Sequence, residues 1–290
     1  MSETQYLAAK TIDEAVNAHE KANGTARFLA GGTDLLVQIK SGIRKPNLVI
    51  DIKKIVELNS INEISDGEFE IGASVSGANL NRNSKFAKLW PGVLEAFRLI
   101  GSEQIQGRAS LGGNLCNGSP AGDSVPALIA AGCKAVIAGP KGRKDVPIEN
   151  FHLGPGKTVL ENGEMLVSLK FPKRVSNSAD AYLRMTPRTE MDIAVVGCGV
   201  NISLENDICT HARVSLGAVA PTPLLIKEAS DIMIGSKLDD DTLDRVSKIC
   251  MDACNPINDK RGTVDYRTKV AGVLAKRATK LAAERIGGNK

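Results

Sequence analysis

Short apolar runs separated by polar turns fill the first part of the chain and predict small strands and helices. Residues 26–30 and 48–51 are apolar runs of strand length. Residues 11–14 form a capping box that predicts a short helix. A second helix is expected after Gly32, with Thr33 as its N-cap and Pro46 forbidding its continuation. A strand–loop–helix–strand order is therefore predicted for about the first 58 residues.

Alternating apolar and polar positions predict two hairpins in the next part of the chain. One spans residues 61–75 and turns at Ser65-Asp66-Gly67, and the other pairs residues 133–138 with 143–146. Between them, an apolar stripe predicts a helix over 91–100, and another helix is expected to follow Asp123. Residues 103–120 lack a clear period and are expected to be irregular. A strand is expected over 164–171, before Pro172.

The pattern changes after residues 175–179, which are expected to form a linker. Strands are predicted over 182–186, 193–204 and 208–219, and the last two are joined by a tight turn. Helical patterns then cover 241–254 and 265–285. Strands followed by helices predict an α+β domain with its helices on one face of a meander. The chain is therefore divided into an expected first domain, 1–175, and a second domain, 176–290.

Two glycine-rich stretches are the candidate binding elements. One is Leu29-Ala30-Gly31-Gly32-Thr33-Asp34-Leu35-Leu36, and the other runs from Ser110 to Pro120. Glycine lets a ligand approach bare N–H groups, and successive N–H groups form an anion-binding concavity. Two such loops facing each other would suit a diphosphate. Ordinary tight turns remain the alternative, because neither stretch is a Walker A loop or a G-x-G-x-x-G motif.

The composition of the chain argues against several classes of function. The net charge is only +4 and aromatic residues are 3% of the chain, which argues against nucleic-acid binding. No apolar run is long enough to span a bilayer, and the start lacks the form of a signal peptide, so a cytoplasmic protein is expected. The six cysteines contain no C-x-x-C pair, so no metal site is expected.

The two glycine loops and the segments around them resemble the FAD-binding medium subunit of the molybdenum hydroxylases, the xanthine dehydrogenase and carbon monoxide dehydrogenase group. The resemblance covers almost the whole chain. It is carried by the first loop and by residues 47–51, 110–123, 162–166 and 188–194, in this order and at these distances.

The resemblance implies a fold and a function. The fold is α+β, with a two-lobed FAD-binding domain of the p-cresol methylhydroxylase (PCMH) and vanillyl-alcohol-oxidase type over 1–175. Its small lobe covers about 1–58 and its larger lobe about 59–175, and an α+β C-terminal domain follows over 176–290. The function is electron transfer from the [2Fe–2S] clusters of a small partner subunit, through FAD, to an external acceptor. A large molybdopterin subunit would oxidise the substrate, in a dimer of heterotrimers.

The resemblance also implies which residues contact FAD. Both glycine loops would bind the pyrophosphate, Asp123 the adenosine ribose, and Arg184 would take the place of a usual lysine near the polar edge of the ring. Ile100 and Leu166 would lie against the cofactor. The full set is Leu29, Ala30, Gly31, Gly32, Thr33, Asp34, Leu35, Leu36, Ile100, Ser110, Gly112, Gly113, Asn114, Asp123, Leu166 and Arg184. No catalytic acid or base is expected, and FAD is expected to be non-covalent because no histidine is near Gly31 in the sequence.

Other interpretations remain open at this stage. A stand-alone flavin oxidase or reductase of the same fold would turn over substrate by itself. An assembly subunit that has lost FAD would fold without binding flavin. Because aromatic side chains are scarce, we also expect partner subunits to complete the wall around the flavin ring. Purines, nicotinate-like heterocycles, aldehydes and carbon monoxide all remain open as substrates of the complex.

Overall fold

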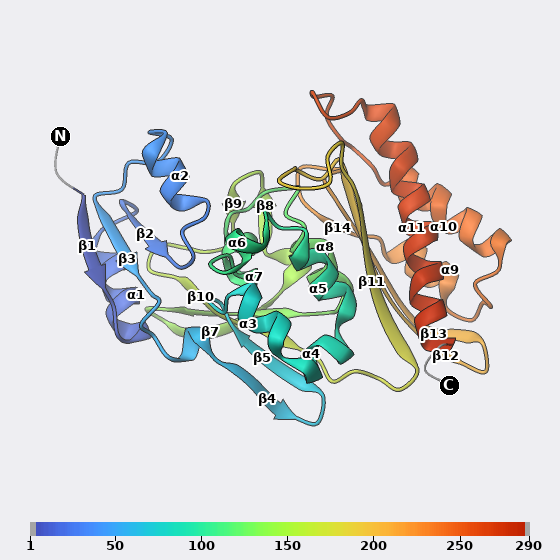
Figure 1. The fold of residues 1–290 in the computed structure, drawn as a ribbon, viewed down its shortest axis with the longest axis horizontal. Coiled ribbons are helices and arrows are strands. Elements are labelled where there is room, and N and C mark those ends of the chain that lie inside the picture. Colours follow the sequence, from blue (N-terminus) through green and yellow to red (C-terminus); the bar gives the residue numbers. More distant parts are fainter. Residues whose placement is uncertain (1–3, 288–290) are drawn as a thin grey trace.

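A computed structural model describes residues 4–287, and its chain runs through three consecutive bodies (Figure 1). A small N-terminal lobe, drawn in blue, lies at one end of the molecule. A larger lobe in cyan and green occupies the middle, and the yellow-to-red C-terminal part lies at the other end. The fold is a mixture of helix and sheet, as the sequence predicts.

The small lobe is a three-stranded parallel sheet with strand order β1-β3-β2, formed by β1 (Gln5–Ala8), β2 (Ala26–Leu29) and β3 (Leu48–Asp51). Helix α1 (Ile12–Lys21) connects β1 to β2, and the Thr11 side chain accepts the N–H of Glu14 in the expected cap. Helix α2 (Leu35–Lys40) connects β2 to β3. The carboxyl end of β2 therefore delivers the first glycine loop directly into α2.

The larger lobe is built on a five-stranded antiparallel sheet with order β4-β5-β10-β6-β7. Its strands are β4 (Ile61–Ser65), β5 (Glu68–Gly72), β6 (Lys134–Gly139), β7 (Gly142–Pro147) and β10 (Met165–Phe171). Six helices lie between β5 and β6: α3 (Gly77–Arg82), α4 (Ser84–Leu89), α5 (Pro91–Arg98), α6 (Glu103–Gln106), α7 (Leu111–Cys116) and α8 (Ser124–Ala130). A small hairpin of β8 (His152–Gly154) and β9 (Lys157–Thr158) precedes β10.

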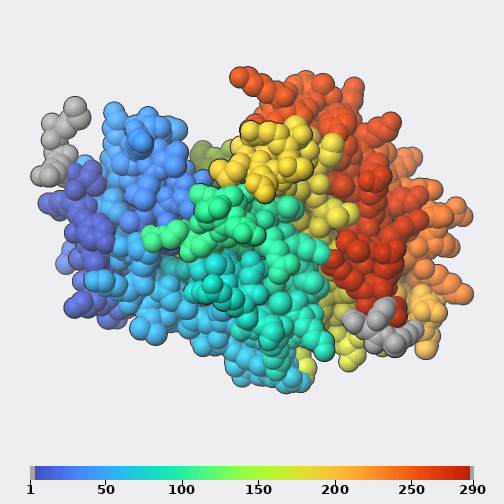
Figure 2. Space-filling view, viewed as in Figure 1, coloured from blue at the N-terminus to red at the C-terminus, as the bar shows by residue number. Residues whose placement is uncertain are grey.

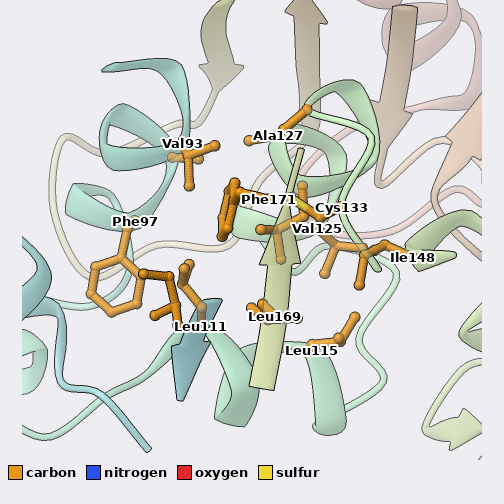
Figure 3. Close-up of a cluster of buried hydrophobic side chains, with 14 of the residues drawn as sticks. Val93, Phe97, Leu111, Leu115, Val125, Ala127, Cys133, Ile148, Leu169 and Phe171 are labelled. Carbon is orange, nitrogen blue, oxygen red and sulfur yellow. The ribbon is translucent and has the colours of Figure 1, made fainter. Parts of the chain in front are cut away.

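Apolar side chains from these helices pack against the central strand β10. Figure 3 shows Val93 and Phe97 of α5, Leu111 and Leu115 of α7, and Val125 of α8 directed toward Leu169 and Phe171. Val93, Phe97, Leu115, Leu169 and Phe171 are completely buried. This core fixes α7, and with it the second glycine loop, against the sheet.

The C-terminal part is a four-stranded antiparallel sheet of β11 (Ser178–Met185), β12 (Val196–Glu205), β13 (Ile208–Gly217) and β14 (Leu224–Leu225). One face is covered by α9 (Lys227–Met233), α10 (Asp240–Asp252) and α11 (Val264–Gly287), which confirms the predicted meander with helices on one face. Val196, Cys198 and Val200 of β12 belong to the core beneath these helices.

The opposite face of this sheet packs closely on α8 of the larger lobe. Glycines make the close approach possible, since a Cβ at Gly199 would lie 2.6 Å from the carbonyl oxygen of Pro126. A Cβ at Gly217 would lie 2.7 Å from the Pro126 ring. The central strand β12 is consequently buried along both faces, although a simple meander would expose one.

Three local expectations from the sequence are wrong. The start of the second glycine stretch is the helix α7 rather than a loop, because Ser110 caps it and Leu111 and Leu115 bury their side chains. Thr33 is not the N-cap of α2, since Asp34 holds that position and makes no side-chain cap bond. The linker expected over 175–179 already enters β11 at Ser178.

Candidate functional site

The two glycine loops meet at one cavity between the small and the larger lobe. The cavity has a volume of about 680 Å³ and is lined by residues of the loop after β2 and by residues of α7. In Figure 2 the blue surface of the small lobe faces the green surface of the larger lobe along this boundary. The two glycine stretches therefore face each other across one cavity, which is the arrangement that would suit a diphosphate.

At two of the glycines in these stretches, another backbone segment passes so close that no side chain would fit. A Cβ at Gly31 would lie 2.0 Å from the carbonyl oxygen of Arg108, just before the second loop. A Cβ at Gly112 would lie 2.4 Å from the carbonyl oxygen of Ala73. Gly32 has a φ of +78°, which disfavours any other residue. Glycine thus lets the two loops approach each other and the sheet.

Unpaired N–H groups line the first loop. The N–H groups of Gly31, Gly32, Thr33 and Asp34 donate to no acceptor within residues 4–287, while the carbonyl of Gly32 accepts the N–H of Leu36. All four residues line the cavity. A run of free N–H groups beside an open space is suited to bind the oxygens of a phosphate or diphosphate. The first loop therefore fits the pyrophosphate of FAD.

Hydrogen bonds hold α7, the start of the second glycine stretch, in place. The Ser110 hydroxyl accepts the N–H of Gly113 at 3.0 Å and so caps α7. The side-chain oxygen of Asn114 accepts the Ser124 hydroxyl at 2.7 Å, which ties α7 to the start of α8. Ser110 and Asn114 both line the cavity, although these bonds already use one polar atom of each.

The structure brings together most of the residues predicted to contact FAD. Twelve of them line the cavity: Ala30, Gly31, Gly32, Thr33, Asp34, Leu35, Ile100, Ser110, Gly112, Gly113, Asn114 and Leu166. Leu29, Leu36, Asp123 and Arg184 lie outside that lining. The direct contact of each residue with FAD remains a prediction.

Asp123 is buried where the larger lobe meets the C-terminal part. Its carboxylate accepts the Tyr182 hydroxyl at 3.0 Å and the Arg184 guanidinium at 2.8 Å. Burial raises the pKa of Asp123 to about 6, although Arg184 and Tyr182 act to lower it. The carboxylate oxygens that were expected to accept hydrogen bonds from a ribose thus accept them from two side chains of β11.

Arg184 lines a second cavity of about 490 Å³. This cavity lies beside the turn after α5, since Leu99 and Gly101 line it while Ile100 lines the first cavity. Thr189 and Glu190 of the segment 188–194 also line it. The two cavities therefore lie next to the same turn, and the segment that carries part of the family resemblance reaches the second one.

The sequence did not identify several residues of the main cavity. His19 of α1 and Phe28 of β2 line it, and so do Arg27, Arg44 and residues from 153 to 165. A histidine is thus present in the cavity, although none is near Gly31 in the sequence. Within 153–165, the sequence pointed only to residues 162–165, as part of the segment 162–166 that carries the family resemblance, and it assigned them no binding role.

Within residues 4–287 no helix has the length and apolar character needed to cross a membrane. The same residues contain no group of three or more His, Cys, Asp or Glu side chains placed to hold a metal ion.

Comparisons with known proteins show the family of the chain. Residues 2–174 match the family described as the FAD binding domain in molybdopterin dehydrogenase, and residues 181–282 match the CO dehydrogenase flavoprotein C-terminal domain. The chain is 31% identical to the xanthine dehydrogenase FAD-binding subunit of Escherichia coli O157:H7, over 98% of this chain and 97% of that one. It is 32% identical to the carbon monoxide dehydrogenase medium chain of Hydrogenophaga pseudoflava, over 96% of each chain.

Solved structures show the same fold. A chain of carbon monoxide dehydrogenase from Hydrogenophaga pseudoflava, in a form that lacks the Mo-pyranopterin moiety of its molybdenum cofactor, superimposes with a TM-score of 0.94 and 32% identity. The match covers 98% of both chains. The fold and the family models thus define a flavoprotein with an FAD-binding domain and a C-terminal flavoprotein domain. The chain belongs to the FAD-binding subunits of the molybdenum hydroxylases, the family of xanthine and carbon monoxide dehydrogenases.

Proposed function

We propose that this chain takes electrons from [2Fe–2S] clusters of a partner subunit and passes them, through FAD, to an external acceptor. The observation that carries the proposal is the interlobe cavity with its run of free N–H groups from Gly31 to Asp34. Bound FAD would supply the redox chemistry, since the flavin ring can accept and release electrons. The residues of this chain hold and orient the cofactor, and none is proposed as an acid or base.

Different residues of the cavity would bind different parts of FAD. The N–H groups of the first loop would hold the pyrophosphate, and Ser110 and Asn114 offer polar atoms beside it. Ile100 and Leu166 would form the apolar wall against the cofactor. Because Ile100 lies in the turn that also borders the second cavity, an acceptor in that cavity would approach close to the cofactor.

We further propose that a large molybdopterin subunit and a small [2Fe–2S] subunit assemble with this chain, as a dimer of heterotrimers. Relatives are named medium chains or FAD-binding subunits, which supports a place within a larger complex. Large apolar side chains also stay exposed near the cavity, at Leu36, Val37 and Ile43 around α2 and at Leu153 of the β8–β9 hairpin. A partner that covers them would complete the site and remove apolar surface from water.

One purification tests this proposal. The chain is co-expressed with the genes that flank its own and is purified through a tag on the chain itself. We expect bound FAD together with molybdenum and iron in the purified material. FAD without partners, and substrate turnover by the chain alone, would support the stand-alone flavoenzyme instead. A folded protein that binds neither flavin nor partners would contradict both interpretations.

A further inference from the structure

Helix α2 carries apolar side chains that no part of the described chain covers. Its sequence is mostly apolar, yet none of its residues is buried within 4–287. Leu36 is 52% exposed, Val37 is 64% exposed, and Ile43, in the loop after the helix, is 73% exposed. Figure 1 shows the helix at the outer edge of the small lobe. Because so short a helix depends on packing for its stability, its outward face is a candidate contact surface.

This apolar surface continues from the small lobe onto the larger lobe. Gln38 of α2 donates to the side-chain oxygen of Asn117, at the end of α7, at 3.2 Å. The N–H of Gly156, in the β8–β9 hairpin, donates to the carbonyl of Gly118 at 2.8 Å. Helix α2, the end of α7 and the hairpin therefore lie side by side, and Leu153 of the hairpin is 68% exposed.

Four exposed apolar side chains thus form one surface, which we call the interlobe patch: Leu36, Val37, Ile43 and Leu153. The segments that carry the patch, 35–50 and 153–160, contain no aspartate or glutamate. Their charged side chains are four exposed cations: Lys40, Arg44, Lys45 and Lys157. Asp34 and Glu161, which flank these segments, are the nearest carboxylates in the sequence. The patch is therefore bordered by an excess of positive charge.

The chain itself does not neutralise this charge. None of the four cations forms an ion pair with any residue between 4 and 287. An apolar centre with a charged rim is the usual anatomy of a protein–protein interface. Carboxylates on a partner would complement such a rim.

Charge and area argue against two other occupants. In a symmetric contact between two copies of this chain, each patch would face its own equivalent, and the two sets of cations would repel each other. Binding to a membrane surface scales with the apolar area that is buried, and four side chains offer little. A protein with an acidic face fits the patch better than either.

We propose that the interlobe patch docks a partner protein of the complex whose contact face is apolar at its centre and acidic at its rim. The inference deepens the assembly proposed above and rests on it. The apolar side chains of the patch pack against the centre of that face, and the four cations pair with its carboxylates. Because the patch carries residues of both lobes, the docked partner bridges them.

The test compares variants of the tagged full chain, each co-expressed with the genes that flank its own and purified as the complex. Dissociation on dilution is measured by analytical ultracentrifugation, at low and at high salt. We expect Val37→Ser combined with Ile43→Ser to weaken the complex about tenfold, and Lys45→Glu to do the same. Only the effect of Lys45→Glu should shrink at high salt, because salt screens exposed charges.

Two matched controls lie elsewhere on the surface. Ile64→Ser removes an apolar side chain of β4 that is 52% exposed, and Lys237→Glu reverses an exposed charge before α10. Both should leave the complex unchanged. All the substituted side chains are exposed, so each isolated variant should keep the melting temperature of the wild type.

A photoreactive amino acid in place of Val37 identifies what touches the patch in the complex. We expect a crosslink to a partner subunit, and none when the same amino acid replaces Ile64. A crosslink from position 37 to a second copy of this chain would overturn the proposal. Binding of the isolated chain to anionic lipid vesicles that is lost in Lys45→Glu would also overturn it.

The outcomes separate the patch from the assembly on which it rests. If the wild type purifies with its partners and the patch variants dissociate as it does, the patch is overturned while the assembly stands. If the wild type purifies without partners, the proposed assembly falls and the docking role falls with it.

Discussion

At the residue scale, Gly31 shows how one position serves the fold and the site together. Its missing side chain allows the first loop to pass against the carbonyl of Arg108, where a Cβ would lie 2.0 Å away. This contact brings the start of α7 beside the free N–H groups of Gly31 and Gly32. The position of the proposed anion site therefore depends on a contact between two segments far apart in the sequence.

Replacing Gly31 by alanine should damage both properties. The added methyl group must push two backbone segments apart, and such overpacking costs about 1–3 kcal/mol. We expect a lower melting temperature and a loss of bound FAD, measured by thermal unfolding and by the flavin released in acid. Gly154→Ala is the control, since a Cβ there meets nothing within 4 Å. Equal behaviour of the two variants would contradict this account of the loop.

Asp180 is a buried carboxylate where the chain passes from the larger lobe into the C-terminal part. It accepts the N–H of Val93 at 3.1 Å and pairs with Arg174 at 3.2 Å. Arg174 in turn lies over the ring of Trp90, 4.4 Å from its centroid. Burial raises the pKa of Asp180 to about 6, which outweighs the opposing effect of Arg174.

This raised pKa predicts the sign of a pH dependence. At pH 5 the folded state keeps a proton on Asp180 that the unfolded chain releases, so protonation stabilises the fold below about pH 6. Relative to Asp180→Asn, which does not titrate, the wild type should gain about 1 kcal/mol of unfolding free energy between pH 7 and pH 5. Urea unfolding at the two pH values measures this gain. A loss of unfolding free energy instead would mean that Arg174 lowers the pKa of Asp180 more than burial raises it.

At the element scale, strand β11 joins the C-terminal part to the start of α8. Tyr182 and Arg184 are two residues apart, so their side chains leave the strand on the same face. Both reach Asp123, at the N-terminus of α8, and Arg184 also borders the second cavity. The next residue, Ser124, donates a hydrogen bond to Asn114, which lines the main cavity. One strand thus supports the second glycine loop without contacting the main cavity.

Removing the two partners of Asp123 should have unequal effects on stability. Tyr182→Phe deletes one hydrogen bond and should cost about 1 kcal/mol of unfolding free energy. Arg184→Met leaves a buried carboxylate without its cation and should cost about 3 kcal/mol or more. Arg184→Lys restores the charge and should recover part of that loss. Urea unfolding of the three variants tests the order, and a larger loss for Tyr182→Phe would contradict it.

The sequence predicted most of the regular elements because their side chains repeat with a clear period. The hairpins of the larger lobe and the C-terminal meander alternate at period two, and α10 and α11 follow a helical pattern. It missed α7, because Gly112, Gly113 and Asn114 disfavour a helix that the Ser110 cap and the buried leucines stabilise. Strands β8 and β9 were missed because three and two residues are too few to show a period.

The residues that line the cavity were predicted only in part, because many of them are brought together by contacts between distant segments. The glycine loops carry a local signal, whereas the contact between His19 and Phe28 depends on how α1 packs beside β2. The involvement of residues 153–165 depends on the contact between lobes, such as the bond from Gly163 to His19. Contacts of this kind join distant parts of the chain and leave no pattern in a single sequence.

At the scale of the whole molecule, the main cavity lies at the junction of two lobes that contribute opposite walls. A ligand bound only by the assembled walls stabilises the folded state by mass action. FAD at about one hundred times its dissociation constant should therefore add about 2.7 kcal/mol to the unfolding free energy. Thermal unfolding of the flavin-free chain with and without FAD measures this, and an unchanged melting temperature would show that FAD does not bind the folded chain.

The central claim is that this chain holds one FAD in the cavity between its lobes. The most direct measurement is the absorption spectrum of the purified full chain, followed by acid precipitation and identification of the flavin that is released. The account predicts a yellow protein that releases FAD, non-covalently bound and close to one per chain. A folded chain that releases no flavin, and that takes up none when FAD is added, would contradict it.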